Sequence, residues 1–188
     1  MDSLSDTELV ERAKQGDGSA FEQLVYRHQD RLVHSLELGT GSREDALEIA
    51  QHAFVSAWKH LNTFRSEAGF YSWLYRIARN CAVTHHRRNR LPTVSLDSIT
   101  ESRGFDTADH EHQPAPSHQL EREDELTQLR QAMSQIPDEF REALILKEID
   151  GLSYEEIARL LEIPMGTVRS RIFRARQELA ERIRRLKK

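Results

Sequence analysis

Four arginines lie within nine residues near the C-terminal end of the chain, in the stretch VRSRIFRAR at residues 168–176. A helical wheel of this stretch has one narrow apolar face, formed by Val168, Ile172, Ala175 and Leu179. The opposite face carries Arg169, Ser170, Phe173 and Arg174. Arg171 and Arg176 flank that polar face. The pattern is typical of a helix that packs on a core and presents basic side chains outward.

The outward side chains have the chemistry needed in a DNA major groove. Arginine can donate two hydrogen bonds to guanine N7 and O6, serine can contact several bases, and an exposed phenylalanine can touch a thymine methyl. Flanking arginines can bind phosphates, which position a helix without reading sequence. The alternatives are a solvated basic helix or one that binds a protein, and Phe173 on the polar face argues against plain solvation. We therefore expect a DNA-recognition helix.

The charge distribution supports two separate contacts with a polyanion. The 188-residue chain has a net charge of −4, yet residues 51–90 carry a net charge of +6 and residues 164–188 one of +7. The remaining segments are all acidic. One basic segment alone could be a solvated helix face, but two within an acidic chain favour nucleic-acid binding in each half.

Helix signals run through the sequence, and no segment alternates with the period of a strand. Ser5 with Glu8, Ser19 with Glu22 and Ser153 with Glu156 are spaced as capping boxes. A helix is expected at about residues 43–61, with an apolar face formed by Leu47, Ala50, Phe54, Ala57 and Leu61. Another is expected at about residues 70–88. The predicted fold class is all-α, with two small helical domains.

The second domain has the pattern of a helix-turn-helix. A capped helix at residues 154–161 is followed by the turn Glu162–Pro164 and by the basic helix that contains residues 168–176. Pro137 is expected at the first position of an earlier helix. These elements would place the arginine face on the surface of the second domain.

Residues 91–118 differ from both flanking segments. They contain three prolines, carry a net charge of −4 and have no helical periodicity, so we expect a flexible acidic linker. The chain would then divide into residues 1–90, the linker, and residues 119–188. His110, His112 and His118 do not match a closed zinc pattern, and a solvated linker is the better interpretation.

Aromatic residues concentrate in the first domain, since seven of the 13 in the chain lie between Phe54 and Tyr75. Arginines follow directly, from Arg76 onward. Aromatic faces stack on unpaired bases while basic residues follow the phosphates, so this segment could hold a melted strand. Phe54 and Trp58 are expected in the core. Phe64, Phe70 and Tyr71 are expected to lack enough apolar neighbours for all three to be core residues, which leaves them for base contact.

Two segments resemble a known family. GLSYEEIARLLEIPMGTVRSRIFRAR (151–176) resembles region four of sigma factors of the extracytoplasmic-function (ECF) group, and FRSEAGFYSWLYRIARNCAVTHHRR (64–88) resembles their region two. The resemblance implies a bacterial transcription-initiation subunit that binds core RNA polymerase and promoter DNA. Region two would bind the polymerase clamp and open the −10 element, and region four would read the −35 element.

The residue patterns and the resemblance together give three sets of candidate site residues. The −35 set is Thr167, Arg169, Ser170, Arg171, Phe173, Arg174 and Arg176. The −10 set is Asn62, Phe64, Arg65, Phe70, Tyr71, Trp73, Arg76, Arg79 and Asn80. The core-polymerase set, within EIAQHAFVSAW (48–58), is Glu48, Gln51, His52 and Val55. His52 departs from the family pattern, which commonly has an acidic residue there.

The sequence also predicts several absences. It has no phosphate-binding loop, metal cluster or nucleophile–base spacing, so we expect no enzymatic activity, cofactor or metal. No apolar segment is long enough for a membrane span or signal peptide, and a cytoplasmic protein is expected. The resemblance adds an anti-sigma factor as a possible partner. Two rival hypotheses remain: a stand-alone helix-turn-helix regulator, and a regulatory protein whose first domain binds only another protein. Promoter-specific transcription with core polymerase would be expected of a sigma factor and of neither rival.

Overall fold

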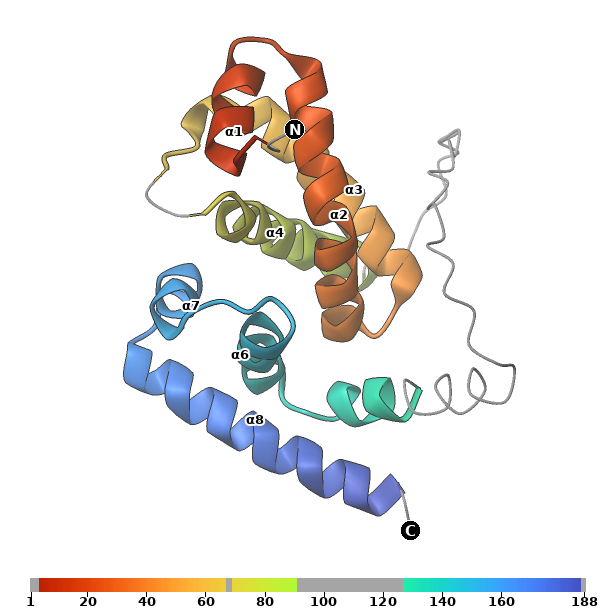
Figure 1. Cartoon of the computed structure of the whole chain (residues 1–188). Coiled ribbons are helices and arrows are strands. Elements are labelled where there is room, and N and C mark those ends of the chain that lie inside the picture. The colour runs from red at the N-terminus through yellow and green to blue at the C-terminus, as the bar shows by residue number, and fades with distance from the viewer. Residues whose placement is uncertain (1–3, 67–68, 91–126, 187–188) are drawn as a thin grey trace, which may run out of the picture.

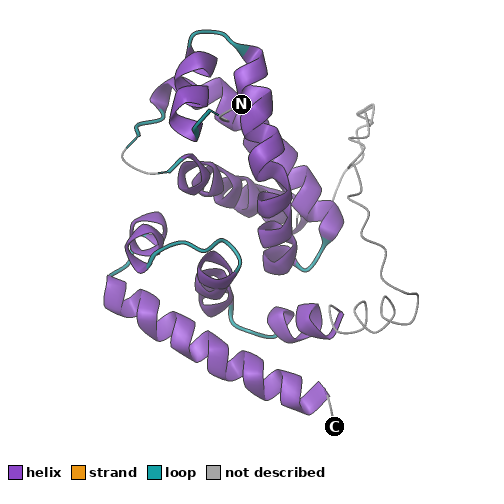
Figure 2. Cartoon of the chain, viewed as in Figure 1, coloured by secondary structure: helices purple, strands orange, loops and turns teal. Residues whose placement is uncertain are grey.

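The structure is a computed structural model of the chain, and it describes residues 4–66, 69–90 and 127–186. Every regular element in these ranges is helical, which confirms the predicted all-α fold (Figure 2). The helices are α1 (Asp6–Lys14), α2 (Gly18–Thr40), α3 (Arg43–His60), the short 3-10 helix η1 (Leu61–Thr63), α4 (Phe70–Arg90), α6 (Asp138–Glu148), α7 (Tyr154–Leu161) and α8 (Met165–Leu186), and residues 127–134 are also helical. The predicted linker at residues 91–118 lies outside the described residues.

Helices α1 to α4 form the N-terminal module, in which α3 packs against both α2 and α4 (Figure 1). Its core is built from side chains with no or almost no exposed surface, among them Leu9, Leu24, Leu32, Ile49 and Leu74. Each such burial contributes about 2 kcal/mol to the free energy of unfolding. The apolar spacing along the sequence therefore brings these helices together on one shared core.

Local side chains fix where these helices begin. Ser5 and Glu8 form the predicted capping box of α1. The predicted box of Ser19 and Glu22 is wrong, because Asp17 caps α2 by accepting a hydrogen bond from the amide of Ala20. The Ser19 hydroxyl instead donates to the Asp17 carboxylate, at 2.7 Å. The N-cap of α2 is therefore Asp17, two residues before the serine that the sequence spacing predicted.

The break between α2 and α3 depends on one glycine. Gly41 ends α2 with a φ of 77°, a left-handed conformation that glycine adopts without steric cost. Its amide donates to the carbonyl of Glu37 at 2.8 Å, and the next residue, Ser42, caps α3. The predicted break at Gly39–Ser42 is therefore a sharp reversal that folds α3 back along α2.

Two residues of α3 differ from the expected inward face. Leu47 is 45% exposed and Trp58 is 43% exposed, although both were expected in the core. The Trp58 ring contacts Phe21, with centroids 4.9 Å apart, and its remaining edge faces solvent. Ala50, Phe54, Ala57 and Leu61 are buried as predicted. The buried face of α3 is thus narrower than the apolar spacing of its sequence predicted. Leu47 and Trp58 lie at its edges as partly exposed apolar side chains.

The C-terminal module comprises residues 127–134 and helices α6 to α8. Ser153 and Glu156 form the predicted capping box of α7, and Glu162 makes the turn into α8 with a φ of 57°. Pro137 is the N-cap of α6 and not its first helical residue. Figure 1 shows α8 on the side of this module that faces away from α1–α4. The helix-turn-helix is thus formed by α7 and α8. The N-terminal module packs against the other side of the C-terminal module, where α2 contacts α6 and α4 contacts α7.

Candidate nucleic-acid interface

The outer face of α8 has the composition that the sequence predicted. Val168, Ile172 and Ala175 are buried, with at most 1% of their surfaces exposed. Arg169, Ser170 and Arg174 are exposed, and Phe173 is 61% exposed. Half-buried Thr167 precedes this face, and its carbonyl accepts a hydrogen bond from the Ser170 hydroxyl at 2.9 Å. The outer face of α8 is therefore basic and exposed, and it lies on the side of the C-terminal module that faces away from α1–α4 (Figure 1).

Two aromatic rings from neighbouring helices support the central arginines. The guanidinium carbon of Arg169 lies 5.6 Å from the ring centroid of Tyr154, the first residue of α7. That of Arg174 lies 5.8 Å from the ring centroid of Phe140 in α6. Attraction between a cation and an aromatic face restricts long side chains without neutralising their charge. Neither ring could be predicted from the sequence, because nothing in the local spacing links Tyr154 or Phe140 to residues on α8.

The flanking arginines form ion pairs with α6. Arg171 pairs with Glu139 at 2.7 Å, and Arg176 pairs with Glu148. The hydrogen bond from Arg176 to that carboxylate raises the pKa of Arg176 further above its ordinary value. Both side chains were expected to reach phosphates. In this structure both instead form ion pairs that connect α8 to α6. An approaching phosphate would have to share or displace these carboxylates.

The aromatic residues of the N-terminal module are less available than expected. Phe64, Phe70 and Tyr71 are only 5%, 3% and 5% exposed, so the expectation that they are free for base contact is wrong. Phe64 and Phe70 pack edge to face with centroids 5.9 Å apart, and the His28 ring lies 5.5 Å from Phe70. The rings are apolar neighbours for one another, and this mutual packing makes all three core residues.

The rest of the predicted −10 set lies at the surface. The exposed members are Asn62, Arg65, Arg76, Arg79 and Asn80. Trp73 is half-buried and packs against Phe64, with centroids 5.2 Å apart. It therefore has one ring face fixed by the core and remains within reach of solvent. Of the nine predicted residues, these six are able to contact DNA without rearrangement of the core.

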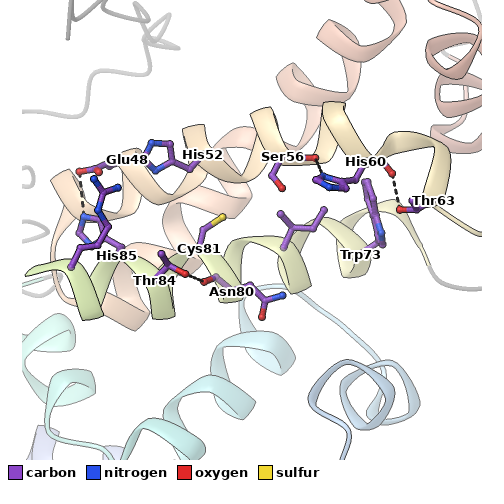
Figure 3. Close-up of a pocket in the computed structure, with 12 residues that line it drawn as sticks. Glu48, His52, Ser56, His60, Thr63, Trp73, Asn80, Cys81, Thr84 and His85 are labelled. Carbon is purple, nitrogen blue, oxygen red and sulfur yellow. Dashed lines mark hydrogen bonds and ion pairs between the residues drawn. The ribbon is translucent and has the colours of Figure 1, made fainter. Parts of the chain in front are cut away.

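A groove of about 800 Å³ runs between α3 and α4 (Figure 3). Glu48 and His52 of the core-polymerase set line its α3 side, and Trp73 and Asn80 of the −10 set line its α4 side. The Glu48 carboxylate contacts the His85 ring at 3.2 Å, at the end of the groove away from Trp73. The fold thus brings Glu48 and His52 to one wall of the groove and Trp73 and Asn80, at least 21 residues later in the sequence, to the other.

The predicted core-polymerase residues share one surface of α3. Glu48, Gln51, His52 and Val55 are spaced at helical intervals, and all four are exposed. Val55 is 49% exposed, and the neighbouring Leu47 adds a second exposed aliphatic side chain. Leu47, which its apolar spacing had assigned to the core, therefore lies beside the four predicted residues on the surface of α3.

These features define a class of protein: an all-helical DNA-binding protein with a helix-turn-helix module and a second module whose basic surface includes one partly exposed tryptophan. Among the described residues, none of the helices has the length and apolar character needed to cross a membrane. Comparisons with known proteins identify the family. Residues 20–91 match the model of sigma-70 region 2, and residues 126–179 match that of sigma-70 region 4.

Relatives match along almost the whole chain. The RNA polymerase sigma-H factor of Pseudomonas aeruginosa is 40% identical over 177 residues, which are 93% of this chain and 91% of that protein. The ECF RNA polymerase sigma-E factor of Escherichia coli is 38% identical over 185 residues, 97% of this chain and 96% of the other. The solved structure of CnrH in complex with the cytosolic domain of CnrY has a TM-score of 0.67 at 27% identity, covering 94% of this chain and 95% of that one.

The chain therefore belongs to the ECF group of sigma-70-type RNA polymerase sigma factors. As a member of this family it binds core RNA polymerase and promoter DNA and directs the initiation of transcription.

Proposed function

We propose that α8 reads the −35 element through Arg169, Ser170, Phe173 and Arg174. The observation that carries this proposal is the exposed face of α8, whose two central arginines are held over the rings of Tyr154 and Phe140. Preorganised donors lose less side-chain entropy on binding and can make bidentate contacts with guanine. Thr167, Arg171 and Arg176 bind the adjacent phosphates and set the depth of the helix in the groove.

The N-terminal module, within residues 1–90, binds the −10 element in this proposal. Trp73 offers a partly open ring for stacking on an unpaired base, beside Asn62 and Arg65 at the entrance to α4. Arg76, Arg79 and Asn80 follow on α4 and contact the neighbouring duplex. This assignment is narrower than the predicted one, because buried Phe64, Phe70 and Tyr71 support the surface and do not form it.

The outer surface of α3 binds core polymerase in this proposal. Glu48, Gln51 and His52 provide polar contacts, while Val55 and Leu47 provide apolar area that a partner can bury. Because Glu48 and His52 also line the groove that contains Trp73, polymerase bound on α3 would lie beside the strand bound at α4. Polymerase binding and promoter opening would thus occur on adjoining surfaces.

The activity consists of binding, without a chemical reaction of its own, and it takes place in the cytoplasm, where polymerase meets the chromosome. The solved structure of CnrH, which this chain resembles, holds CnrH in complex with the cytosolic domain of CnrY, and this supports a further protein partner, which we propose to be an anti-sigma factor. Residues 119–188 act as the −35 module and residues 91–118 as the connection between the modules.

Run-off transcription tests this function directly. The purified chain is mixed with bacterial core enzyme and a library of promoters, and transcripts are mapped to their start sites. The expected result is initiation from a defined subset that shares −35 and −10 sequences and depends on the chain. Tight sequence-specific binding to duplex DNA by the free chain, with no initiation at any promoter, would instead support a stand-alone regulator.

A further inference from the structure

Lys14 connects α1 to the segment that enters α4. It lies in the last turn of α1, and its side chain is only 21% exposed. Its ammonium donates a hydrogen bond of 3.2 Å to the backbone carbonyl of Phe64, which lies 50 residues further along the sequence. A lysine on a surface helix ordinarily extends its ammonium into water. The covered side chain and its distant backbone partner therefore give Lys14 a defined place in the fold.

The ammonium of Lys14 makes a second contact with the same residue. It lies over the Phe64 ring, 5.9 Å from the centroid, within the range of attraction between a cation and an aromatic face. It also pairs with Glu11 of its own helix, at 3.0 Å. The Glu11 side chain is 56% exposed, so water competes for that pair and the pair contributes little to stability. Two of these three contacts thus link α1 to Phe64.

The turn between α1 and α2 orients Lys14 toward this carbonyl. Asp17 caps α2 and also pairs with Arg12 of α1, at 2.8 Å. Its amide donates to the carbonyl of Arg12 at 3.2 Å, and Gly16, which precedes it, has a left-handed φ of 95°. These interactions fix α1 beside α2, where α1 also contacts η1.

Phe64 packs against the residue proposed to stack on an unpaired base. Its ring centroid lies 5.2 Å from that of Trp73 and 5.9 Å from that of Phe70. Phe64 is buried, so it cannot shift without disturbing the core. A series of direct contacts therefore runs from Lys14 through Phe64 to Trp73.

The carbonyl bound by Lys14 also lies between two exposed members of the proposed −10 surface. Asn62 is in η1, just before Phe64, and Arg65 follows it directly. The Phe64 amide donates to the carbonyl of Leu61 at 3.0 Å, so both sides of Phe64 are held by backbone hydrogen bonds. Fixing a peptide group removes conformations that the segment would otherwise sample.

We propose that Lys14 is a positioning residue of the −10 surface, and that it acts by holding Phe64. Trp73, Asn62 and Arg65 then keep the arrangement in which they meet an unpaired base. Lys14 contacts no DNA in this role, because its ammonium is bonded to the Phe64 carbonyl. The helix α1 thus contributes to promoter opening although none of its residues belongs to the predicted sets. This rests on the proposed function of the −10 surface, whereas the contact between Lys14 and Phe64 is independent of it.

The variants separate positioning from charge. Lys14→Met keeps a long side chain and removes the donor, whereas Lys14→Arg keeps a charged donor and should restore the behaviour of the parent. Glu11→Gln is the matched control, since it changes the other partner of the same ammonium and leaves the contact with Phe64. Lys14→Gln replaces Lys14→Met if that variant fails to fold. Circular dichroism and denaturant unfolding verify the fold of every variant in the full-length chain.

The first measurement reports on Trp73 in the absence of DNA. Trp58→Phe leaves Trp73 as the single tryptophan, since the chain has two, and the neutral quencher acrylamide then measures access to its ring. We expect stronger quenching in Lys14→Met than in the parent, and parental quenching in Lys14→Arg and Glu11→Gln. Equal quenching in Lys14→Met and the parent overturns the proposal.

The second measurement is binding of fluorescent single-stranded −10 oligonucleotides of several sequences to the complex with core enzyme. Lys14→Met should reduce the preference for the best sequence about threefold to tenfold, as expected for loss of one partly exposed hydrogen bond. The slope of affinity against salt should stay that of the parent, because no phosphate contact is removed. Equal weakening of every sequence, with a smaller slope, would show that Lys14 binds a phosphate, and it would overturn the positioning role.

A combined variant separates this proposal from the −10 assignment. Adding Lys14→Met to Asn62→Ala and Arg65→Ala should change the −10 preference less than it does in the parent, because the residues that Lys14 positions are already absent. An equal change in both backgrounds would show that Lys14 positions neither of them. If Asn62→Ala and Arg65→Ala themselves leave the preference unchanged, the −10 assignment is wrong, and the quenching of Trp73 still decides whether Lys14 holds Phe64 in place.

Discussion

Tyr154 lies beneath Arg169, with its ring centroid 5.6 Å from the guanidinium carbon, so the residue that begins α7 orients a side chain on α8. The same ring also contacts the ammonium of Lys147, at 4.9 Å. The proposed −35 surface therefore depends on three helices and not on α8 alone, so residues outside α8 should contribute to its affinity for DNA.

Replacing Tyr154 with leucine should weaken −35 binding by about 0.5–1 kcal/mol, because Arg169 is then without its aromatic support. Tyr154→Phe keeps the ring face and should bind like the parent. The measurement is competition between −35 duplexes for the complex with core enzyme. Equal weakening in both variants would show that the hydroxyl matters and the ring face does not.

Arg169→Ala and Arg174→Ala should each cost about 1–3 kcal/mol at the preferred −35 sequence and relax the preference at one position. Arg171→Ala and Arg176→Ala should weaken all −35 sequences alike, and each should reduce the slope of affinity against salt by about 1, because one phosphate is no longer neutralised. Binding to a panel of −35 variants at several salt concentrations separates the two patterns. Identical behaviour of all four variants would contradict the assignment of faces on α8.

Phe64→Ala should lower the free energy of unfolding by about 3–5 kcal/mol, since its ring is 5% exposed and is enclosed by other rings. Asn62→Ala and Arg65→Ala, at exposed positions beside it, should change stability by less than about 0.5 kcal/mol but alter which −10 variants open. Denaturant unfolding gives the first quantity, and permanganate footprinting of unpaired thymines gives the second. A fully stable Phe64→Ala would contradict its place in the core.

Val55→Asp should reduce affinity for core polymerase at least about fivefold, because a charge is placed in the apolar part of the α3 surface. Val83→Asp is the matched control, since Val83 is 66% exposed on α4 and belongs to none of the proposed surfaces. Fluorescence anisotropy of labelled chain with core enzyme measures both. His52→Glu tests the departure from the family pattern, and tighter binding is expected if the acidic residue contributes to clamp affinity.

His28 should make stability depend on pH. Burial lowers its pKa from the ordinary value of 6.5, against the attraction of Asp6 at 2.7 Å. The unfolded chain therefore binds this proton more readily, so the contribution of His28 to stability is present above pH 6.5 and is lost as pH falls through the lowered pKa. Thermal unfolding from pH 8 to pH 5 should show a smaller decrease in His28→Gln than in the parent. The exposed His34→Gln on the same helix should follow the parent.

The sequence by itself determined the helices and the face of α8. Capping pairs such as Ser153 with Glu156 act over three residues, and the apolar spacing of Val168 and Ile172 defines what must be buried. Both are local properties of the chain, which is why the boundaries of α7 and the exposure of Phe173 could be predicted.

Only the tertiary structure decided which aromatic rings remain available and how the modules meet. Phe64 and Phe70 are buried because they pack on each other and on Trp73, an arrangement set by how η1 leads into α4. Asp150 contacts Ser35 and Tyr71, which are 115 and 79 residues away in sequence. Contacts over such separations depend on the complete fold, because side-chain burial is decided by which surfaces meet and not by the composition of either one alone.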